Sequence, residues 1–454
     1  MNNITNYQRL NNIIGWFIFL IAAFTYLSTM ESTASFWDCG EYIACAYKLE
    51  VGHPPGAPLF LLIGRFFSLF AFGDTAKVGM MINAMSALCS AFTILFLFWS
   101  ITALARKIVA KGEEFTTANM YAVFGAGAVG ALAYTFSDSF WFSAVEGEVY
   151  AMSSFFTAIV FWAILKWERE VDENPHADRW IILIAYLMGL SIGVHLLNLL
   201  AIPAIVFIYY FKKNQKITTK SLIVTGIISI IILGGIQGGI IPMVVKLAAK
   251  IELFAVNTMG LPFNSGTIIY GVLLIGGIIW GLQYTAKKVK PIMNTVILCF
   301  TVILIGYSSF LILVIRSQAN PPMDENNPEN AVNLLSYLNR EQYGTWPIVY
   351  GQYYSAPVTG YEDGSPVYVQ DVKKGKYVIS DDRKGSVRVY DEDFCTIFPR
   401  MWSDQSQHIA GYRRWTNPRN YKHKTILDPQ TGEHVSAEIP TFAENLKFFF
   451  VYQL

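Results

Sequence analysis

Residues 78–102 read VGMMINAMSALCSAFTILFLFWSIT, an apolar run without a charged side chain. A helix needs about 20 apolar residues to cross a bilayer, so this run predicts a transmembrane helix. Similar runs predict further spans at 12–30, 119–136, 149–167, 221–245, 266–286 and 293–315. The stretch 180–211 is too long for one span and carries polar residues in its middle, which favours two short helices turning near Val194–His195. We therefore expect about nine transmembrane helices.

The composition agrees with an integral membrane protein. Of the 454 residues, 53% are hydrophobic and only 15% are charged, against about 25% charged in soluble proteins. The net charge is +1 and no long basic stretch is present, which argues against nucleic acid as a partner. Five scattered cysteines without a CxxC pair support no disulfide framework. The fold class that we predict is a polytopic α-helical membrane protein.

Basic residues gather in three of the predicted loops, all on one side of the membrane. They are Arg106–Lys107 with Lys111, Lys212–Lys213 with Lys216 and Lys220, and Lys287–Lys288 with Lys290. The positive-inside rule makes this side cytoplasmic. The loops 31–77, 137–148 and 246–265, and everything after 315, then face outward. The run 12–30 is long for a signal peptide and lacks a good cleavage site, so we expect an uncleaved first helix.

Two domains follow from the change in composition after residue 315. Residues 1–315 form the predicted transmembrane module, with an apolar, interfacial segment at 58–73 in its first external loop, 31–77. Residues 316–454 are mostly polar, and the alternation at 376–379 and 387–390 predicts strands of a small extracytoplasmic α/β or β domain. The chain turns apolar again at 448–452 and stops, which suggests a longer protein truncated before further spans.

The first external loop carries the most unusual residues of the chain, FWDCGEY at 36–42 and HPPGAP at 53–58. Asp38 and Glu41 are three apart and would share one face of a helix. Carboxylates close to a bilayer are candidates for function, although carboxylates in a solvated loop are also common. His53 precedes two prolines that hold its backbone extended. It could donate to a phosphate, ligate a metal or cap the turn.

Further polar residues fall on the same predicted outer face. Glu146 and Glu148 form a second acidic element, His195 and Asn198 lie where the short helices turn, and Arg316 ends the last span. Elements from distant parts of the chain thus converge on one side of the membrane, which predicts a membrane-embedded active site there.

The pattern Asp38-x-x-Glu41 followed by His53-Pro54-Pro55-Gly56-x-Pro58 resembles a bacterial membrane family long labelled a domain of unknown function, with vertebrate protein O-mannosyltransferases as relatives. The resemblance continues through Glu148-Val149-Tyr150, Arg316-Ser317 and 338–344. The family is similar to type C (GT-C) glycosyltransferases, which take a sugar from a polyprenyl-phosphate carrier outside the membrane. The resemblance implies a GT-C-like fold, an active site in the first external loop, residence in the bacterial inner (cytoplasmic) membrane, and membrane lipid and an exported protein acceptor as partners.

The resemblance also implies roles for these residues in inverting transfer to a Ser or Thr hydroxyl. Asp38 is the expected base, with Glu41 as the alternative or as its orienting partner. The departing phosphate needs positive or hydrogen-bonding groups, for which His53 and Arg316 are the first candidates and Arg65 and Lys48 the second.

The remaining candidates concern the sugar and a cation. Glu148 could hold sugar hydroxyls, bind a divalent cation or set the pKa of Asp38, and a metal requirement stays open. Trp37 and Tyr42 could stack on the sugar or anchor at the interface, and anchoring is favoured for Trp141. Mannose rests on the vertebrate relatives alone.

Two alternatives stay open. A transporter or flippase for a lipid-linked sugar would place charged residues near the bilayer midplane. Here the acids cluster at span ends, which argues against it. An inactive membrane scaffold is the second alternative, and only an assay distinguishes it from an enzyme.

Overall fold

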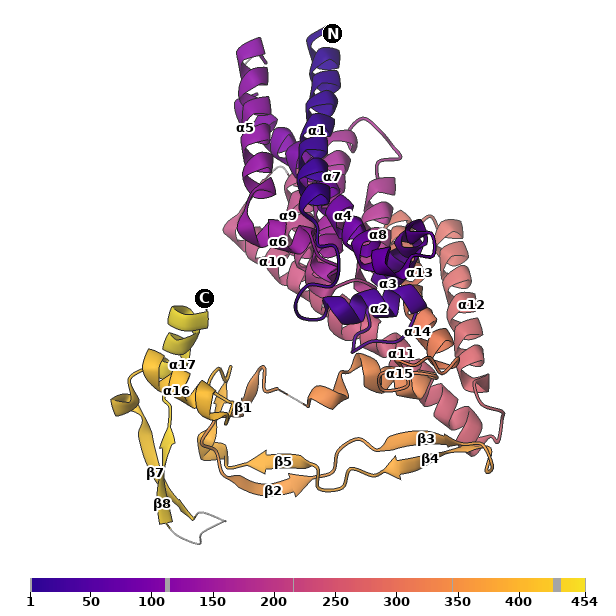
Figure 1. Ribbon diagram of the computed structural model, residues 1–454, viewed down its shortest axis with the longest axis vertical. Coiled ribbons are helices and arrows are strands. Elements are labelled where there is room, and N and C mark those ends of the chain that lie inside the picture. Colours follow the sequence, from indigo (N-terminus) through magenta and orange to yellow (C-terminus); the bar gives the residue numbers. More distant parts are fainter. Residues whose placement is uncertain (1, 111–114, 215, 345, 428–433, 454) are drawn as a thin grey trace. The chain divides into compact units, whose positions relative to one another are not determined.

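The computed structural model describes residues 2–110, 115–214, 216–344, 346–427 and 434–453. The chain forms two compact units, Met1–Arg340 (unit 1) and Glu341–Leu454 (unit 2). Unit 1 is mostly helical (Figure 1). Its helices are α1 (Asn2–Thr29), α2 (Cys39–Lys48), α3 (Pro58–Ser68), α4 (Val78–Val109), α5 (Thr117–Thr135), α6 (Asp138–Ala144), α7 (Val149–Glu170), α8 (Arg179–Ile192), α9 (Ile202–Lys213), α10 (Thr219–Gly234), α11 (Ile241–Leu253), α12 (Ser265–Lys287), α13 (Pro291–Tyr307), α14 (Leu311–Ser317) and α15 (Ala331–Leu338).

The described residues contain seven helical segments that are long and apolar enough to cross a membrane. An eighth results if α5 and α6, which meet at 67°, count as one bent span. This confirms a polytopic helical membrane protein. The difference from the expected nine lies in α8, which at 14 residues is shorter than a crossing. The expected turn near Val194–His195 is present, because α8 ends at Ile192 and a 3-10 turn, Leu196–Ala201, leads into α9.

The expected outer loop 246–265 is mostly helix, which corrects the prediction. A continuous helical segment runs from Thr219 to Thr258 through two π-helical stretches, Gly235–Ile240 and Phe254–Thr258. It continues past the apolar run because Ala248 and Ala249 of α11 pack against Ala331 of α15. The carboxylate of Glu252 then accepts a hydrogen bond from the Asn264 N–H (2.6 Å) at the start of α12. The sequence pattern missed this extension because tertiary contacts stabilise it.

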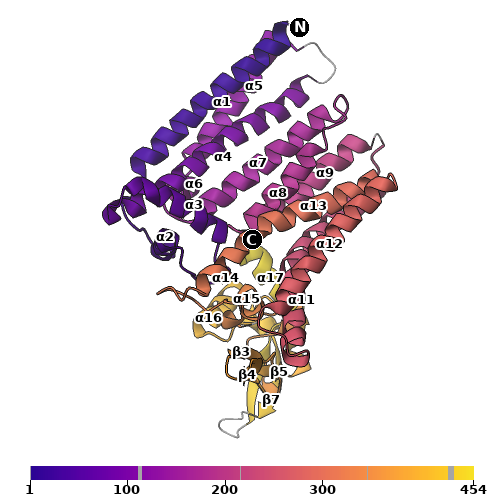
Figure 2. The same ribbon diagram turned by 90° about the vertical axis from the view of Figure 1, so that its right-hand side faces the viewer.

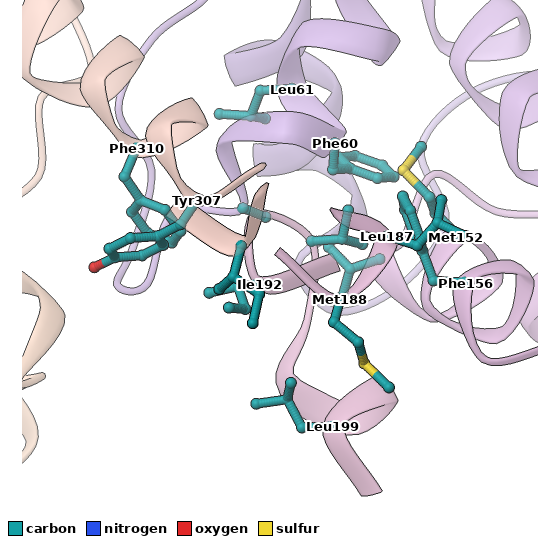
Figure 3. Close-up of a cluster of buried hydrophobic side chains, with 14 of the residues drawn as sticks. Phe60, Leu61, Met152, Phe156, Leu187, Met188, Ile192, Leu199, Tyr307 and Phe310 are labelled. Carbon is teal, nitrogen blue, oxygen red and sulfur yellow. The ribbon is translucent and has the colours of Figure 1, made fainter. Parts of the chain in front are cut away.

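The long helices of unit 1 form a layer in which α4 contacts α1, α5 and α7, α8 contacts α7 and α13, and α13 contacts α12 (Figure 2). The main core lies where this layer meets α3. Figure 3 shows Phe60 and Leu61 of α3 beside side chains of α7, α8 and the end of α13. The segment expected to lie at the interface, 58–73, therefore buries one face of α3 in the core. This burial fixes the position of α3, which follows the segment that carries His53.

The division between the units falls after Arg340, beyond the expected boundary at 315. The reason is that α14 extends the last span and α15 packs against α11, so both belong to unit 1. Val51 also forms a parallel β-bridge with Asp324, which ties the segment after α14 to the first external loop.

Unit 2 is a small domain whose described residues form four two-stranded antiparallel sheets, β1–β6, β2–β5, β3–β4 and β7–β8. The strands are β1 (Tyr350–Gln352), β2 (Val358–Glu362), β3 (Val367–Asp371), β4 (Lys376–Asp381), β5 (Val387–Tyr390), β6 (Cys395–Ile397), β7 (Lys422–Leu427) and β8 (His434–Ile439). Helices α16 (Ser406–Trp415) and α17 (Phe442–Phe448) complete it. Its core includes Tyr353, Met401, Tyr412 and Phe448. The two stretches predicted as strands correspond to β4 and β5.

Candidate active site

Asp38 stands at the first position before α2 and is open to solvent. The preceding Trp37 has φ +59°, a left-handed conformation that turns the chain into the helix. The Asp38 side chain makes no capping hydrogen bond to α2 and is 58% exposed. A carboxylate at this position commonly accepts a backbone N–H bond from the first turn. Because Asp38 makes no such bond and is mostly exposed, its carboxylate is available to accept a proton from a bound molecule.

Glu41, one turn further along α2, holds His53. Its Oε1 accepts hydrogen bonds from the His53 main-chain N–H (2.7 Å) and from its Nδ1 (2.9 Å). The other ring nitrogen, Nε2, lies 3.9 Å from Oδ2 of Asp38. A Cβ at position 52 would overlap Glu41 Oε1, so a larger residue there would displace the carboxylate that holds His53. Asp38 lies one residue before α2 and Glu41 within its first turn, and the His53 imidazole lies between the two carboxylates.

The two partners of this hydrogen bond change each other's protonation. The hydrogen bond from His53 holds the pKa of Glu41 below its ordinary value, despite partial burial. The same bond raises the pKa of His53, with the charges of Glu41 and Asp38 adding to the effect. Both shifts favour the charge-paired form, a protonated His53 imidazole beside an ionised Glu41 carboxylate.

The second acidic element is buried beside the first. Glu146 accepts a hydrogen bond from the Ser35 hydroxyl (2.5 Å) and lies 3.6 Å from the Cys39 sulfur. Glu148 is the residue before α7 and accepts a hydrogen bond from the Val149 N–H (3.1 Å). Burial raises the pKa of Glu148 to about 7, and the nearby charges of Asp38 and Glu146 act in the same direction. Glu148 thus exchanges its proton close to physiological pH.

The loop before Asp38 is fixed by backbone contacts. Asn83 of α4 donates to the carbonyls of Glu31 (2.7 Å) and Thr33 (2.9 Å). The Glu31 N–H donates to the Val145 carbonyl (2.9 Å), next to the second acidic element. These bonds tie the start of the loop to α4 and to Val145, the residue before Glu146.

Glu325 is an acidic neighbour that sequence reasoning missed. Its N–H donates to the Val51 carbonyl (3.0 Å), and the Val51 N–H donates to the Met323 carbonyl (3.0 Å). Tyr337 of α15 donates to the Gly52 carbonyl (2.6 Å). Burial and the charge of Glu41 raise the pKa of the Glu325 carboxyl. Its position in a polar stretch after the last span, on the predicted outer face, was the available signal.

The other residues predicted to bind the phosphate, Arg316, Arg65 and Lys48, lie at the C-terminal end of α2, away from Asp38. Arg316 donates to the carbonyls of Leu49 (2.6 Å) and Lys48 (3.3 Å), and Arg65 donates to the Tyr47 carbonyl (2.5 Å). The Lys48 side chain is exposed. The structure therefore brings His53, but not these three residues, next to Asp38. Arg316 and Arg65 hold the C-terminal end of α2 through its free carbonyls.

The remaining candidate residues, Tyr42, His195, Trp37 and Asn198, differ in burial and in the groups that they contact. Tyr42 packs edge-on against His53, with ring centroids 5.6 Å apart, and His195 lies 5.5 Å from the ring of Tyr150. Trp37 is 88% exposed and Asn198 is fully buried, where its amide donates to Ser191 (2.9 Å). Tyr42 thus supports the imidazole, Trp37 is free to contact a ligand, and Asn198 braces the turn after α8.

A divalent cation could be held by Asp38, Glu41 and His53. One potential ligand atom from each lies within 4.8 Å of the others. Two carboxylates and an imidazole suit a first-row metal ion such as Mn²⁺. Metal binding requires neutral imidazole, whereas Glu41 favours the protonated form. A proton on His53 and a metal ion are therefore alternatives in this site.

Comparison with known proteins agrees with the resemblance seen in the motifs. Residues 38–218 match the family model described as Protein O-mannosyl-transferase TMEM260 N-terminal domain, and residues 344–450 match a family of unknown function, DUF8416. The chain is 27% identical over 209 residues to the protein O-mannosyl-transferase tmem260 of Dictyostelium discoideum. It is 25% identical over 208 residues to the protein of that name from Mus musculus.

These alignments cover 44% and 45% of the chain but only 24% and 27% of the length of the two relatives. No solved structure matches the chain. The matched region begins at Asp38 and includes Glu41, His53, Glu146 and Glu148. The chain is therefore related to vertebrate protein O-mannosyltransferases, as its motifs indicated, and the relationship includes the candidate site.

Proposed function

We propose that the protein is a membrane glycosyltransferase that moves a sugar, mannose or a similar hexose, from a polyprenyl-phosphate carrier to a Ser or Thr hydroxyl of an exported protein. The observation that carries this proposal is the placement of His53 between Glu41 and Asp38, at the start of the region shared with the O-mannosyltransferases. In this proposal the site faces away from the cytoplasm, in the inner membrane of a bacterium.

Asp38 is the base. The acceptor hydroxyl attacks the anomeric carbon, the bond from that carbon to the phosphate oxygen breaks, and Asp38 takes the hydroxyl proton. Its exposed carboxylate, free of a capping bond, is suited to this role. Attack without a covalent sugar–enzyme intermediate inverts the anomeric carbon.

His53 stabilises the leaving phosphate. Glu41 fixes its Nδ1 and favours the protonated ring, so Nε2–H is available to a developing negative charge. Glu41 is then the positioning residue rather than the base. Because the proton on His53 supplies the positive charge, we expect transfer to continue in excess EDTA.

The neighbouring residues serve the sugar and the acceptor. Glu148, whose pKa is about 7, can donate a hydrogen bond to a sugar hydroxyl in its neutral form. Trp37 offers an exposed ring on which a sugar can stack. The role expected for Arg316, Arg65 and Lys48 at the phosphate is less well supported than that of His53, because the two arginines are engaged by carbonyls of α2. Unit 2 is proposed to select the acceptor.

The test is sugar transfer by the purified full chain in nanodiscs, from a polyprenyl-phosphate sugar to a Ser/Thr-rich peptide. Asp38→Asn should lower kcat by about 10²- to 10⁴-fold, because general base catalysis contributes that much. Glu31→Gln is the matched control, since Glu31 is an exposed acid of the same loop. It should retain wild-type activity.

An active Asp38→Asn protein would remove Asp38 as the base. If the wild-type protein transfers no sugar, the enzyme proposal fails for this chain. The same purified protein, reconstituted into vesicles, would then be assayed for translocation of the sugar-linked lipid, which tests for a transporter. The absence of both activities would favour a scaffold.

A further inference from the structure

A cavity of about 870 Å³ lies between α1, α4 and α7, remote from Asp38. Its walls include Asn11 near the start of α1, Arg106 near the end of α4 and Arg169 near the end of α7. The candidate active site is at the opposite ends of these helices, where Asn83 of α4 and Glu148, the residue before α7, lie. The cavity is therefore a separate site, at the membrane side predicted to be cytoplasmic.

Aromatic rings form the apolar wall of this cavity. Trp99 of α4 lies 6.3 Å from Trp16 of α1 and 5.8 Å from Trp162 of α7, between ring centroids. Phe96 lies 5.1 Å from Trp162. The rings of three helices therefore pack against one another and form a continuous aromatic wall. Such a wall, at the end of membrane-spanning helices, suits hydrocarbon chains.

The rim of the cavity is strongly basic. The described lining residues include five basic side chains and one acid, Glu168. The basic residues are Arg106, Lys107, Lys166, Arg169 and Lys212. Glu168 pairs with Lys107, and Lys212 pairs with Asp172 outside the lining.

Lys166 and Arg169 make no ion pair within the described part of the chain. Lys166 instead lies over the ring of Trp162, 5.1 Å from its centroid. The positive-inside rule accounts for basic residues at this membrane side. It does not account for their position around an aromatic-walled hollow.

We propose that this cavity binds one anionic diacyl phospholipid, with its acyl chains along Trp16, Trp99 and Trp162 and its phosphate between Lys166 and Arg169. A basic rim over an apolar wall matches a molecule whose negative charge is joined to hydrocarbon. The bound lipid would complete the contact between α1 and α7, which flank α4.

The experiment is native mass spectrometry of the full chain titrated with dioleoyl phosphatidylglycerol, dioleoyl phosphatidylcholine or undecaprenyl phosphate. Wild-type protein should bind phosphatidylglycerol at least tenfold more tightly than either of the others. The double variant Lys166→Gln/Arg169→Gln should lose at least tenfold in affinity. Lys287→Gln/Lys288→Gln is the matched control, because these exposed lysines lie at the end of α12 and do not line the cavity. It should bind like the wild type.

The variant Ala103→Phe tests the volume of the cavity without changing its charge. Ala103 lines the cavity, so a phenyl ring there should block lipid binding while every basic residue is kept. The proposal is overturned if this variant binds phosphatidylglycerol normally, if the control pair weakens binding as much as Lys166 and Arg169 do, or if undecaprenyl phosphate binds most tightly. Circular dichroism of each variant verifies folding, and the two cavity variants test the site independently.

Discussion

At the scale of single residues, the Glu41–His53 pair determines how the candidate site responds to pH. The pKa of Glu41 is lowered from 4.5, so its stabilising contribution is present above pH 4.5 and is lost as the pH falls through the lowered value. The pKa of His53 is raised from 6.5, so its contribution is present below pH 6.5 and is lost as the pH rises through the raised value. Both contributions to the stability of the fold are therefore fully present between pH 4.5 and pH 6.5.

Glu41→Gln should lower the pKa of His53 toward 6.5. The amide oxygen can still accept both His53 hydrogen bonds, but it carries no charge to favour imidazolium. We expect the high-pH decline of transfer activity to move to lower pH by the same amount. NMR titration of the imidazole, assigned with a His53→Gln variant, measures the shift. A His53 pKa that is unchanged in Glu41→Gln would contradict the proposed coupling.

Glu148 should be active in its neutral form. Burial raises its pKa to about 7, so Glu148→Gln, which resembles the protonated acid, should keep activity within about threefold at pH 6. Above pH 7 the variant should exceed the wild type, because it cannot ionise. Parallel pH profiles of the two proteins test this. A loss of more than about 100-fold at pH 6 would indicate that the ionised carboxylate is required, as it would be in a metal ligand.

At the scale of elements, α2 positions the site because it is held at both ends. Asp38 and the Glu41–His53 contact lie at its beginning, and Arg316 and Arg65 bind the carbonyls at its end. Sequence reasoning identified these residues as functional, but it assigned the arginines to the substrate phosphate. The structure places both guanidinium groups on carbonyls at the end of α2 instead. The physical reason is that the last carbonyls of a helix have no partner within it, and a nearby guanidinium satisfies them.

Arg316→Gln should lower stability and activity together. The substitution removes charge-assisted hydrogen bonds to Leu49 and Lys48, a loss of about 1–3 kcal/mol for a half-buried group. We expect a lower Tm and a lower kcat, with the KM for the donor nearly unchanged. Lys48→Gln is the control, because that side chain is exposed at the same end of α2. A raised donor KM at unchanged Tm would instead favour direct phosphate binding by Arg316.

At the scale of the whole helical layer, two glycines allow α8 and α13 to cross closely. A Cβ on Gly189 would overlap the backbone at Ile303, and a Cβ on Gly306 would overlap the backbone of α8 at Gly189 and Leu190. Backbone cannot move aside as a flexible side chain can. These contacts join the middle of the chain to its last span and hold together the core shown in Figure 3.

Gly189→Ala and Gly306→Ala should each destabilise the protein by about 1–3 kcal/mol, the usual cost of overpacking. Gly271→Ala is the matched control, because nothing lies within 4 Å of a Cβ at that position of α12. It should leave Tm unchanged or raise it slightly, since alanine favours helix. Thermal unfolding of the full chain in one detergent compares all three. Equal Tm values would show that the close crossing contributes nothing.

The sequence by itself determined the membrane class, most of the spans and the broken helix near His195. These features depend on local composition and periodicity, which a single stretch of chain carries. Only the tertiary structure decided that α11 continues beyond its apolar run, that the first unit extends to Arg340 and that Glu325 joins the acids.

The tertiary structure also decided which groups the candidate residues contact. The Arg316–Leu49 bond joins residues 267 apart in sequence, and the Ser35–Glu146 bond joins residues 111 apart. Such contacts depend on which helices pack together. Burial and close approach then set the protonation of Glu148 and His53, because the free energy of a charge depends on its surroundings more than on its neighbours in sequence.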